Sequence, residues 1–282
     1  ITHFFNPPRL MRLVEVVGPA GAALTGILRE ELGKHVLGCR DTPGFIANRV
    51  GSFWMSAGAS IALERGIDIE LADAAFARPV GVPRTGIFGL FDYIGLQVVP
   101  GIWDSLLSAL APDDTFHRYD GLVTSAPISW LLEHGHTGRT GDSGFWRGRG
   151  EVLDPDALAY RQVRPVTDPV TQARGIAQAI EVDSAGGRYV WEVFATTLAY
   201  CCEVAPEIAE SVADVDAAME LGYSWKQGPF RMADSIGLDE VRARFTAEGR
   251  EIPALLADAT AFYPRPGQAL ATDGTVADLP AG

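Results

Sequence analysis

The sequence predicts a mainly α-helical fold, with a short α/β segment at its start and two helical units after it. Three observations support this prediction. Residues 1–41 show a strand–helix–strand pattern, long helical patterns separated by Gly and Pro follow from residue 42, and those patterns contain an internal repeat. We therefore expect four segments, 1–41, 42–150, 151–262 and 263–282, the last of them a linker or tail rich in Pro, Gly, Ala and Asp.

The first segment alternates strands and a helix. Apolar runs predict strands at Ile1–Phe5, around Glu15 and at His35–Cys39, and an amphipathic pattern predicts a helix at Ala20–Leu32, closed by Gly33. The chain starts inside an apolar strand pattern, without Met or a polar tail, so we expect a truncation. Residues upstream, or a partner chain, would then supply sheet neighbours for the first strand.

The helical part begins after Asp41, where Thr42-Pro43-Gly44 breaks the chain and a long helical pattern follows at Phe45–Arg65. The internal repeat is visible at a constant offset of 142 residues, at which Gly86–Leu96 matches Gly228–Leu238. Upstream of this block, Asp73–Phe76 matches Asp216–Met219, with a separation one residue longer.

Each copy of the repeat holds an aspartate six residues after its first Gly, Asp92 in one and Asp234 in the other. We interpret this pair as caps of a helix or a turn. Duplicated helical domains usually pack on each other, so the sequence predicts an internal pseudo-dimer of the two helical domains.

Composition excludes several classes of protein. The net charge of -13 and a pI near 4.8 argue against a nucleic-acid binder, which needs clustered Lys and Arg. No apolar run approaches the length of a membrane span and the start lacks the pattern of a signal peptide, so we expect a cytoplasmic protein that does not bind membranes. Cys39, Cys201 and Cys202 lack the spacing of ligand pairs and are expected to be buried thiols.

The first fifteen residues hold the candidate catalytic pair, His3 and Glu15. Strand alternation puts the Glu15 side chain on the face of Leu13 and Val17, where a buried carboxylate needs a partner, and a histidine reached through a turn would be a natural one. The alternative, equally compatible with the spacing, is an edge-strand Glu15 that reaches solvent and a His3 packed against neighbouring phenylalanines.

Other polar clusters are weaker candidates. His134 and His136 lie in a Gly-rich loop without a third ligand, so we assign no metal site. The Gly-rich stretch from Gly138 to Gly150 is a turn-rich loop and not a phosphate cradle, because no strand pattern precedes it and no Lys-Ser/Thr follows it.

One block of motifs resembles the L-3-hydroxyacyl-CoA dehydrogenase family. It runs His3-Phe4-Phe5-Asn6-Pro7, Leu10-Met11, Leu13-Val14-Glu15-Val16, Gly33-Lys34 and Asp41-Thr42-Pro43-Gly44-Phe45-Ile46-Ala47-Asn48-Arg49. The resemblance extends to about residue 245 and is looser after the first fifty residues. It implies the tail end of a Rossmann α/β domain followed by two tandem all-helical 3-hydroxyacyl-CoA dehydrogenase C-terminal-like domains, a fold also described as 6-phosphogluconate dehydrogenase C-terminal-like.

The resemblance also implies roles for individual residues. His3 would be the general base that removes the proton of the substrate 3-hydroxyl while hydride passes to NAD, Glu15 would orient the His3 ring, and Asn48 would bind the acyl carbonyl or the reacting oxygen. Arg49 would be structural. The substrate would be an acyl-CoA thioester of fatty-acid β-oxidation, and long members of the family often carry a fused enoyl-CoA hydratase.

The sequence departs from the family at the cofactor site. No Gly-x-Gly-x-x-Gly motif follows a strand, so no cofactor-binding residue is assigned within this chain. We therefore expect this fragment to bind NAD poorly and to be inactive alone. Two alternatives stay open: a dehydrogenase for a non-CoA 3-hydroxy acid, and a helical scaffold that mediates assembly of a multifunctional enzyme, which the tandem repeat favours.

Overall fold

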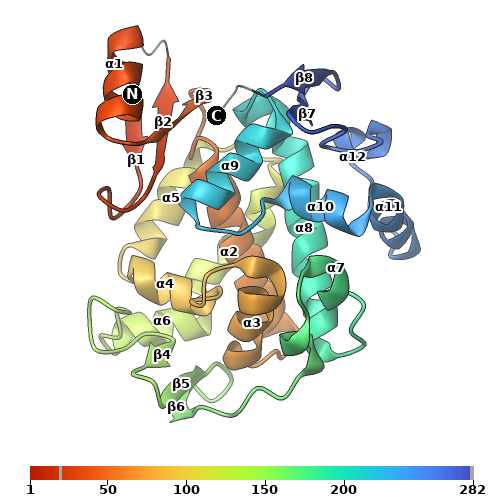
Figure 1. Cartoon of the computed structure of the whole chain (residues 1–282). Helices are drawn as coiled ribbons and strands as arrows, with labels where there is room; N and C mark the ends of the chain where they lie inside the picture. The colour runs from red at the N-terminus through yellow and green to blue at the C-terminus, as the bar shows by residue number, and fades with distance from the viewer. Residues whose placement is uncertain (19–20, 280–282) are drawn as a thin grey trace. The chain divides into compact units, whose positions relative to one another are not determined.

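The computed structural model describes residues 1–18 and 21–279 (Figure 1). The chain divides into two compact units. Unit 1 comprises Ile1–Gly51 and Ala195–Gly282, and unit 2 comprises Ser52–Phe194. The expected mainly helical fold is confirmed. The domain boundaries expected after residues 41, 150 and 262 were drawn from the sequence patterns and differ from the limits of these two units. They stay a prediction.

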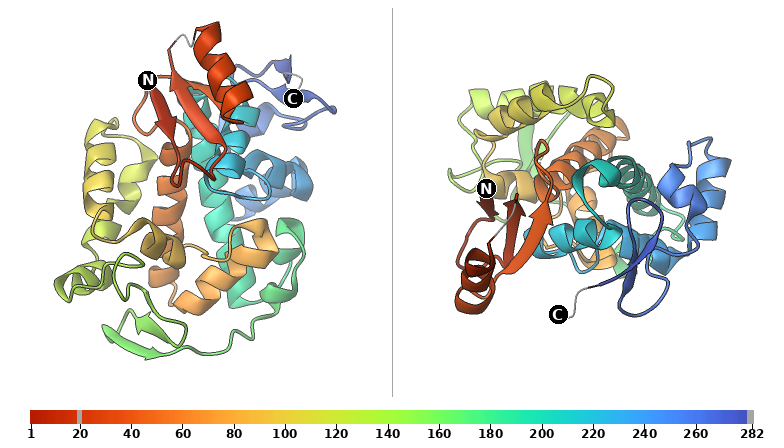
Figure 2. Two further views of the ribbon diagram at one scale, coloured as in Figure 1. Left: turned by 60° about the vertical axis from the view of Figure 1, so that its left-hand side comes forward. Right: turned by 90° about the horizontal axis from the view of Figure 1, so that it is seen from above.

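Unit 1 opens with a small sheet in the order β1-β2-β3. Its strands are β1 (Thr2–Phe4), β2 (Leu13–Val17) and β3 (His35–Cys39). The first pair is antiparallel and the second parallel. Between β2 and β3 the chain forms α1 (Ala22–Gly26) and a π-helical turn, η1 (Ile27–Glu31), which lie beside the sheet (Figure 2). The predicted strand–helix–strand order is confirmed, although Ala20, the predicted start of the helix, lies outside the described residues.

A small hydrophobic cluster packs η1 against the sheet. Leu28 of η1 packs with Val14 and Val16 of β2, and Val36 of β3 lies against them. The first strand, expected to need a neighbour from upstream or from a partner chain, pairs with β2. Strand β2 is therefore central, and the alternative that placed Glu15 on an edge strand is wrong.

The remainder of unit 1 is helical and ends in a hairpin. Helix α2 (Ala47–Glu64) starts in unit 1, and α8 (Ala185–Ile208) ends in it. The further elements are α9 (Val212–Gly222), α10 (Pro229–Ile236), α11 (Leu238–Ala247), α12 (Ala254–Asp258), β7 (Gln268–Leu270) and β8 (Val276–Asp278).

The hairpin falls in the segment that its composition predicts to be a linker. Strands β7 and β8 pair antiparallel, the Leu270 amide donates to the Phe262 carbonyl and the Thr272 amide donates to the Glu210 carbonyl. Both strands have three residues, too short for the alternation by which a strand is recognised in a sequence.

Unit 2 combines helices with a small antiparallel sheet, β4-β5-β6. The helical elements are α3 (Ile69–Phe76), η2 (Ala77–Gly81), α4 (Phe88–Ile94), α5 (Val99–Ala109), η3 (Thr115–Thr124), α6 (Ala126–Glu133), η4 (Pro169–Gln172) and α7 (Ile176–Ala179). The strands are β4 (Trp146–Arg147), β5 (Glu151–Asp154) and β6 (Ala159–Gln162). No helix in the described part of the chain has the length and apolar character that crossing a membrane requires.

The two copies of the sequence repeat share aspartates that bind backbone amides. Asp92 accepts from the amides of Phe145 and Trp146 at 2.8 Å each. Asp234 accepts from the amides of Phe262 and Tyr263 at 2.9 and 2.8 Å. Neither aspartate caps the helix that contains it, because Asp92 lies within α4 and Asp234 lies within α10. Each aspartate fixes the backbone of a distant segment, which extends the repeat to residues 145–146 and 262–263.

A second pair of aspartates holds the start of the helix that follows. Asp73 accepts the amides of Ile87, Phe88 and Gly89 at the start of α4. In the other copy, Asp216 accepts the amides of Phe230 and Arg231 in α10. Pro229 stands at the position of Ile87 and has no N–H, which explains the smaller number of bonds in the second copy.

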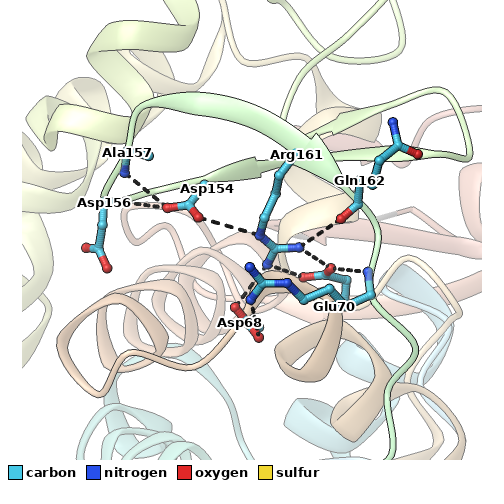
Figure 3. A network of polar contacts seen from close by, with 8 residues as sticks. Asp68, Glu70, Asp154, Asp156, Ala157, Arg161 and Gln162 are labelled. Atoms are coloured by element: carbon cyan, nitrogen blue, oxygen red, sulfur yellow. Dashed lines mark hydrogen bonds and ion pairs between the residues drawn. The ribbon is translucent and has the colours of Figure 1, made fainter.

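Ion pairs connect the small sheet of unit 2 to α3 (Figure 3). Arg161 of β6 lies among three carboxylates, those of Asp68, Glu70 and Asp154. The Glu70 side chain is only 4% exposed, and the Arg164 amide also donates to it, at 2.9 Å. Burial alone would raise the pKa of Glu70, but these hydrogen bonds outweigh it and lower that pKa.

The cysteines carry no disulfide bond. Cys201 and Cys202 are buried, as predicted, whereas Cys39 is only partly buried. Burial raises the pKa of all three thiols.

Candidate active site

The predicted pair His3 and Glu15 meets in the structure. The two residues lie directly opposite each other in the antiparallel β1–β2 register, and His3 Nδ1 lies 2.8 Å from Glu15 Oε2. Side chains of directly opposed residues stand on the same face of a sheet, so the register itself brings the imidazole and the carboxylate together.

The other oxygen of Glu15 binds the beginning of α2. Glu15 is fully buried, and its Oε1 accepts the amides of Ile46 and Ala47 at 3.0 and 2.8 Å. Ile46 directly precedes α2 and Ala47 is its first residue, at a helix start where backbone N–H groups lack helical partners and the helix dipole favours an anion. Gly44 and Phe45 adopt positive φ angles of 77° and 50°, a turn that leads the chain from the break after Asp41 into the helix.

Glu15 therefore links three elements: β1 through His3, β2 through its own backbone, and α2 through two amides. As a carboxylate it is purely an acceptor, and it can accept all three hydrogen bonds at once. With Glu15 ionised, Nδ1 of His3 carries the proton and donates it, which leaves Nε2 as the acceptor nitrogen.

The His3 ring is packed on aromatic neighbours but stays accessible. Its centroid lies 4.6 Å from that of Phe5 and 5.8 Å from that of Phe45, and the side chain is 29% exposed. Nε2 makes no hydrogen bond to any residue within 1–18 and 21–279. The arrangement therefore offers a fixed ring, a defined tautomer and a free basic nitrogen, which suits it to accept a proton from a hydroxyl group.

Sequence reasoning missed the two backbone amides and the Phe45 ring. The strand pattern indicated that Glu15 is buried, but not which element covers it. The only available signal was the block around Pro43-Gly44-Phe45, which marks a sharp turn into a helix. Cys39 was also not connected with the site, although the charge of Glu15, after burial, contributes to its raised pKa.

Asn48 and Arg49 follow Ala47 in the first turn of α2. Asn48 is half-buried, and its side-chain amide has no hydrogen bond in the part of the chain that the structure describes. Arg49 is 1% exposed, donates to the Tyr200 hydroxyl and the Pro43 carbonyl, and lies 3.5 Å from Glu207. Arg49 thus anchors the helix start, while Asn48 keeps its amide available for a ligand.

The histidines of the Gly-rich loop have other partners. The His134 ring stacks on Trp130 with centroids 4.5 Å apart, and His136 Nδ1 lies 2.7 Å from Ser143 Oγ. Among the described residues no group of three His, Cys, Asp or Glu side chains could hold a metal ion.

Comparison with known proteins connects the chain to one family. The family model described as 3-hydroxyacyl-CoA dehydrogenase, C-terminal domain, matches residues 44–148 and 187–255. A Rickettsia felis protein assigned as a fatty acid oxidation complex trifunctional enzyme is 37% identical over 245 residues, 82% of this chain and 33% of that protein. A Bacillus subtilis protein assigned as a 3-hydroxyacyl-CoA dehydrogenase is 29% identical over 271 residues, 89% of this chain and 34% of that protein.

The chain thus spans about a third of the length of these relatives. Among solved structures, 3-hydroxybutyryl-CoA dehydrogenase from Escherichia coli K12 has a similar fold, with a TM-score of 0.62 at 22% identity over 91% of this chain and 69% of that chain. Asn48 lies within the match to the family model, whereas His3 and Glu15 precede it.

Proposed function

The chain belongs to the 3-hydroxyacyl-CoA dehydrogenase family, and from this membership we propose that it is part of an L-3-hydroxyacyl-CoA dehydrogenase of fatty-acid β-oxidation. The reaction would oxidise 3-hydroxyacyl-CoA to 3-oxoacyl-CoA with NAD. The observation that carries the proposal is the His3–Glu15 hydrogen bond of 2.8 Å, which leaves the second ring nitrogen free beside a partly exposed surface.

In this proposal His3 is the general base. Its Nε2 takes the proton of the substrate 3-hydroxyl as the bond from C3 to hydrogen breaks, and it returns that proton in the reverse reaction. Glu15 stabilises the imidazolium that forms and keeps Nδ1 protonated before the transfer. A positioned base of this kind accelerates a reaction by roughly 10²- to 10⁴-fold.

Asn48 is proposed to bind the oxygen of the substrate. It follows directly after Ala47, whose amide holds Glu15, so the same helix turn fixes the carboxylate and presents the Asn48 amide. An amide N–H is a suitable donor to a thioester carbonyl or to the reacting oxygen. The free hydrogen-bonding capacity of the side chain supports this role.

The residues of this chain do not fit NAD by themselves. A dinucleotide site needs a Gly-rich turn from a parallel strand into a helix, so that amides can approach the pyrophosphate. Helix α1, which follows β2, has five residues, and the sequence holds no Gly-x-Gly-x-x-Gly. We derive no step through the cofactor from these residues and propose that its binding residues lie outside this sequence.

The proposal extends to location and partners. The name of the Rickettsia felis relative mentions a trifunctional enzyme of fatty acid oxidation, which supports an acyl-CoA thioester substrate and a fused enoyl-CoA hydratase domain here. A cytoplasmic location and an internal pseudo-dimer of the two repeats are further parts of the proposal.

The experiment is NADH production by the full-length gene product that contains these residues, followed at 340 nm in assays with NAD present in excess. The substrates are 3-hydroxybutyryl-CoA, a longer 3-hydroxyacyl-CoA and free 3-hydroxybutyrate. We expect turnover with at least one thioester and none with the free acid. Turnover of the free acid alone would favour a non-CoA dehydrogenase, and a folded protein without turnover would favour the scaffold alternative.

A further inference from the structure

Unit 2 contains a cavity of about 920 Å³ that the proposed reaction does not use. It lies among α3, the start of α4, the Gly-rich loop and the segment 163–166. Four arginines of the described chain line it, all of them exposed: Arg84, Arg139, Arg149 and Arg164. In a chain with a net charge of -13, this concentration of guanidinium groups around one cavity is unexpected.

The carboxylates of the cavity wall do not neutralise these arginines. Glu70 is paired with Arg161, which lies outside the lining (Figure 3). Asp73 and Asp92 are buried and bind backbone amides. Asp142 is exposed and is the remaining acidic residue of the lining.

The arginines themselves are weakly engaged. Among the described residues Arg84 and Arg149 have no ion pair, while Arg164 lies 3.8 Å from the exposed Asp68. The Arg139 guanidinium lies 5.2 Å from the centre of the Tyr93 ring. Their hydrogen-bond donors are therefore free for an anion, and the planar guanidinium group matches the geometry of phosphate.

The two copies of the repeat differ in whether an arginine covers the aromatic ring that binds the buried aspartate. In the second copy, Arg231 covers the Tyr263 ring at 3.9 Å, and Tyr263 donates its hydroxyl to Asp216. In the first copy, Trp146 takes the place of Tyr263 and donates its Nε1–H to Asp73. At the position of Arg231 stands Gly89, which has no side chain to cover the ring.

Trp146 therefore lines the cavity with a ring that no described residue stacks upon. A planar group can occupy over Trp146 the place that the Arg231 guanidinium occupies over Tyr263. Stacking of a flat heteroaromatic base on an indole ring is favourable and does not depend strongly on the base.

We propose that this cavity binds a nucleoside diphosphate group, with the base stacked on Trp146 and the phosphates held by the surrounding arginines. The volume is in the range of small-molecule sites. The group can belong to a free nucleotide or form the nucleotide end of a larger molecule such as coenzyme A. The inference does not depend on the proposed dehydrogenase activity.

Titration calorimetry of the 282-residue chain with ADP, coenzyme A and inorganic pyrophosphate tests the proposal. We expect one ADP or one coenzyme A per chain, weaker binding at high salt, and weaker binding of pyrophosphate. The tighter of the two nucleotides identifies the source of the group. Absence of binding by both nucleotides, or pyrophosphate binding as tight as theirs, would overturn the proposal.

Gly89→Arg provides a blocking variant. A Cβ atom at Gly89 would meet its nearest neighbour, Asp73 Oδ2, at 3.5 Å, an ordinary contact, so the helix should accept the side chain. The arginine should then cover Trp146 as Arg231 covers Tyr263 and abolish nucleotide binding. Gly101→Arg, on an exposed position of α5 with no atom within 4 Å, adds the same charge away from the cavity and should leave binding unchanged.

The arginines are tested by Arg84→Gln combined with Arg149→Gln. Both side chains are exposed and unpaired in the described residues, so the fold should tolerate the change, and nucleotide affinity should fall about tenfold or more. Arg118→Gln, exposed and outside the lining, is the control. Unchanged affinity in Gly89→Arg or in the double variant, with thermal melting as in the parent chain, would refute the proposed site.

Discussion

Replacing Glu15 by Gln tests the link between the carboxylate, the histidine and the helix. The change preserves the size of the buried side chain and removes its charge. The glutamine oxygen can still accept the amides of Ile46 and Ala47, but the glutamine NH₂ group then faces His3. The imidazole has to accept there with Nδ1, which moves its proton to Nε2 and removes the basic nitrogen.

The expected magnitudes follow from three hydrogen bonds to one carboxylate. A hydrogen bond to a charged group contributes about 1.5–3 kcal/mol and a neutral one about 0.5–1.5 kcal/mol. The loss of charge assistance, about 1–1.5 kcal/mol in each of three bonds, should therefore lower the free energy of unfolding by about 3–4.5 kcal/mol. The inverted tautomer should lower kcat of the full-length gene product by about 10²- to 10⁴-fold.

Two assays separate these effects. Urea denaturation gives the stability, and ¹⁵N NMR of the imidazole in the 282-residue chain reports which ring nitrogen of His3 carries the proton, independently of activity. Glu30→Gln, on the exposed face of η1, is the matched control and should change stability by less than about 0.5 kcal/mol. A Glu15→Gln protein with the parent tautomer and parent stability would refute the reasoning.

Three further changes test separate parts of the account. Burial raises the pKa of Asp73 from 3.8 to about 7, so the folded state binds more protons than the unfolded state between these pH values. The unfolding free energy of the parent, relative to that of Asp73→Asn, should therefore fall as pH rises from about 4 to 7. Urea denaturation that shows no such fall would contradict the raised pKa. Arg161→Met leaves the Glu70 carboxylate buried without its cation and should lower the unfolding free energy by about 3–5 kcal/mol. Urea denaturation measures this loss, and a loss below about 0.5 kcal/mol would show that the network is not stabilising. Asn48→Ala should leave thermal melting unchanged but reduce kcat/KM at least about tenfold, and steady-state kinetics with parent values would remove Asn48 from the site.

The pairing of His3 with Glu15 could be predicted because it is local. Two strand patterns joined by a turn need only the correct register, and apolar residues on both sides of Glu15 indicated a buried carboxylate. The contribution of α2 could not be predicted in the same way. It depends on how a helix start more than thirty residues later docks on the strand, which no periodicity of either segment encodes.

The long-range contacts of the repeat could not be predicted from the sequence either. Matching aspartates were visible in the sequence, and residue type suggested that they cap a helix or a turn. Their partners, Phe145-Trp146 and Phe262-Tyr263, lie far along the chain and outside the matching block, so they became apparent only in the structure. The hairpin near the end was missed for a different reason, because Pro, Gly and Asp suit a tight hairpin as well as they suit a linker.

The measurement that tests the central claim most directly compares His3→Gln with His117→Gln in the full-length gene product. His117 is a partly buried histidine whose ring Nε2 lies 3.0 Å from the Ala111 carbonyl, and it serves as the control. The account predicts that NADH formation from 3-hydroxyacyl-CoA falls by about 10²-fold or more in His3→Gln and is unchanged in His117→Gln. Full activity in a folded His3→Gln protein would contradict the assignment of His3 as the base.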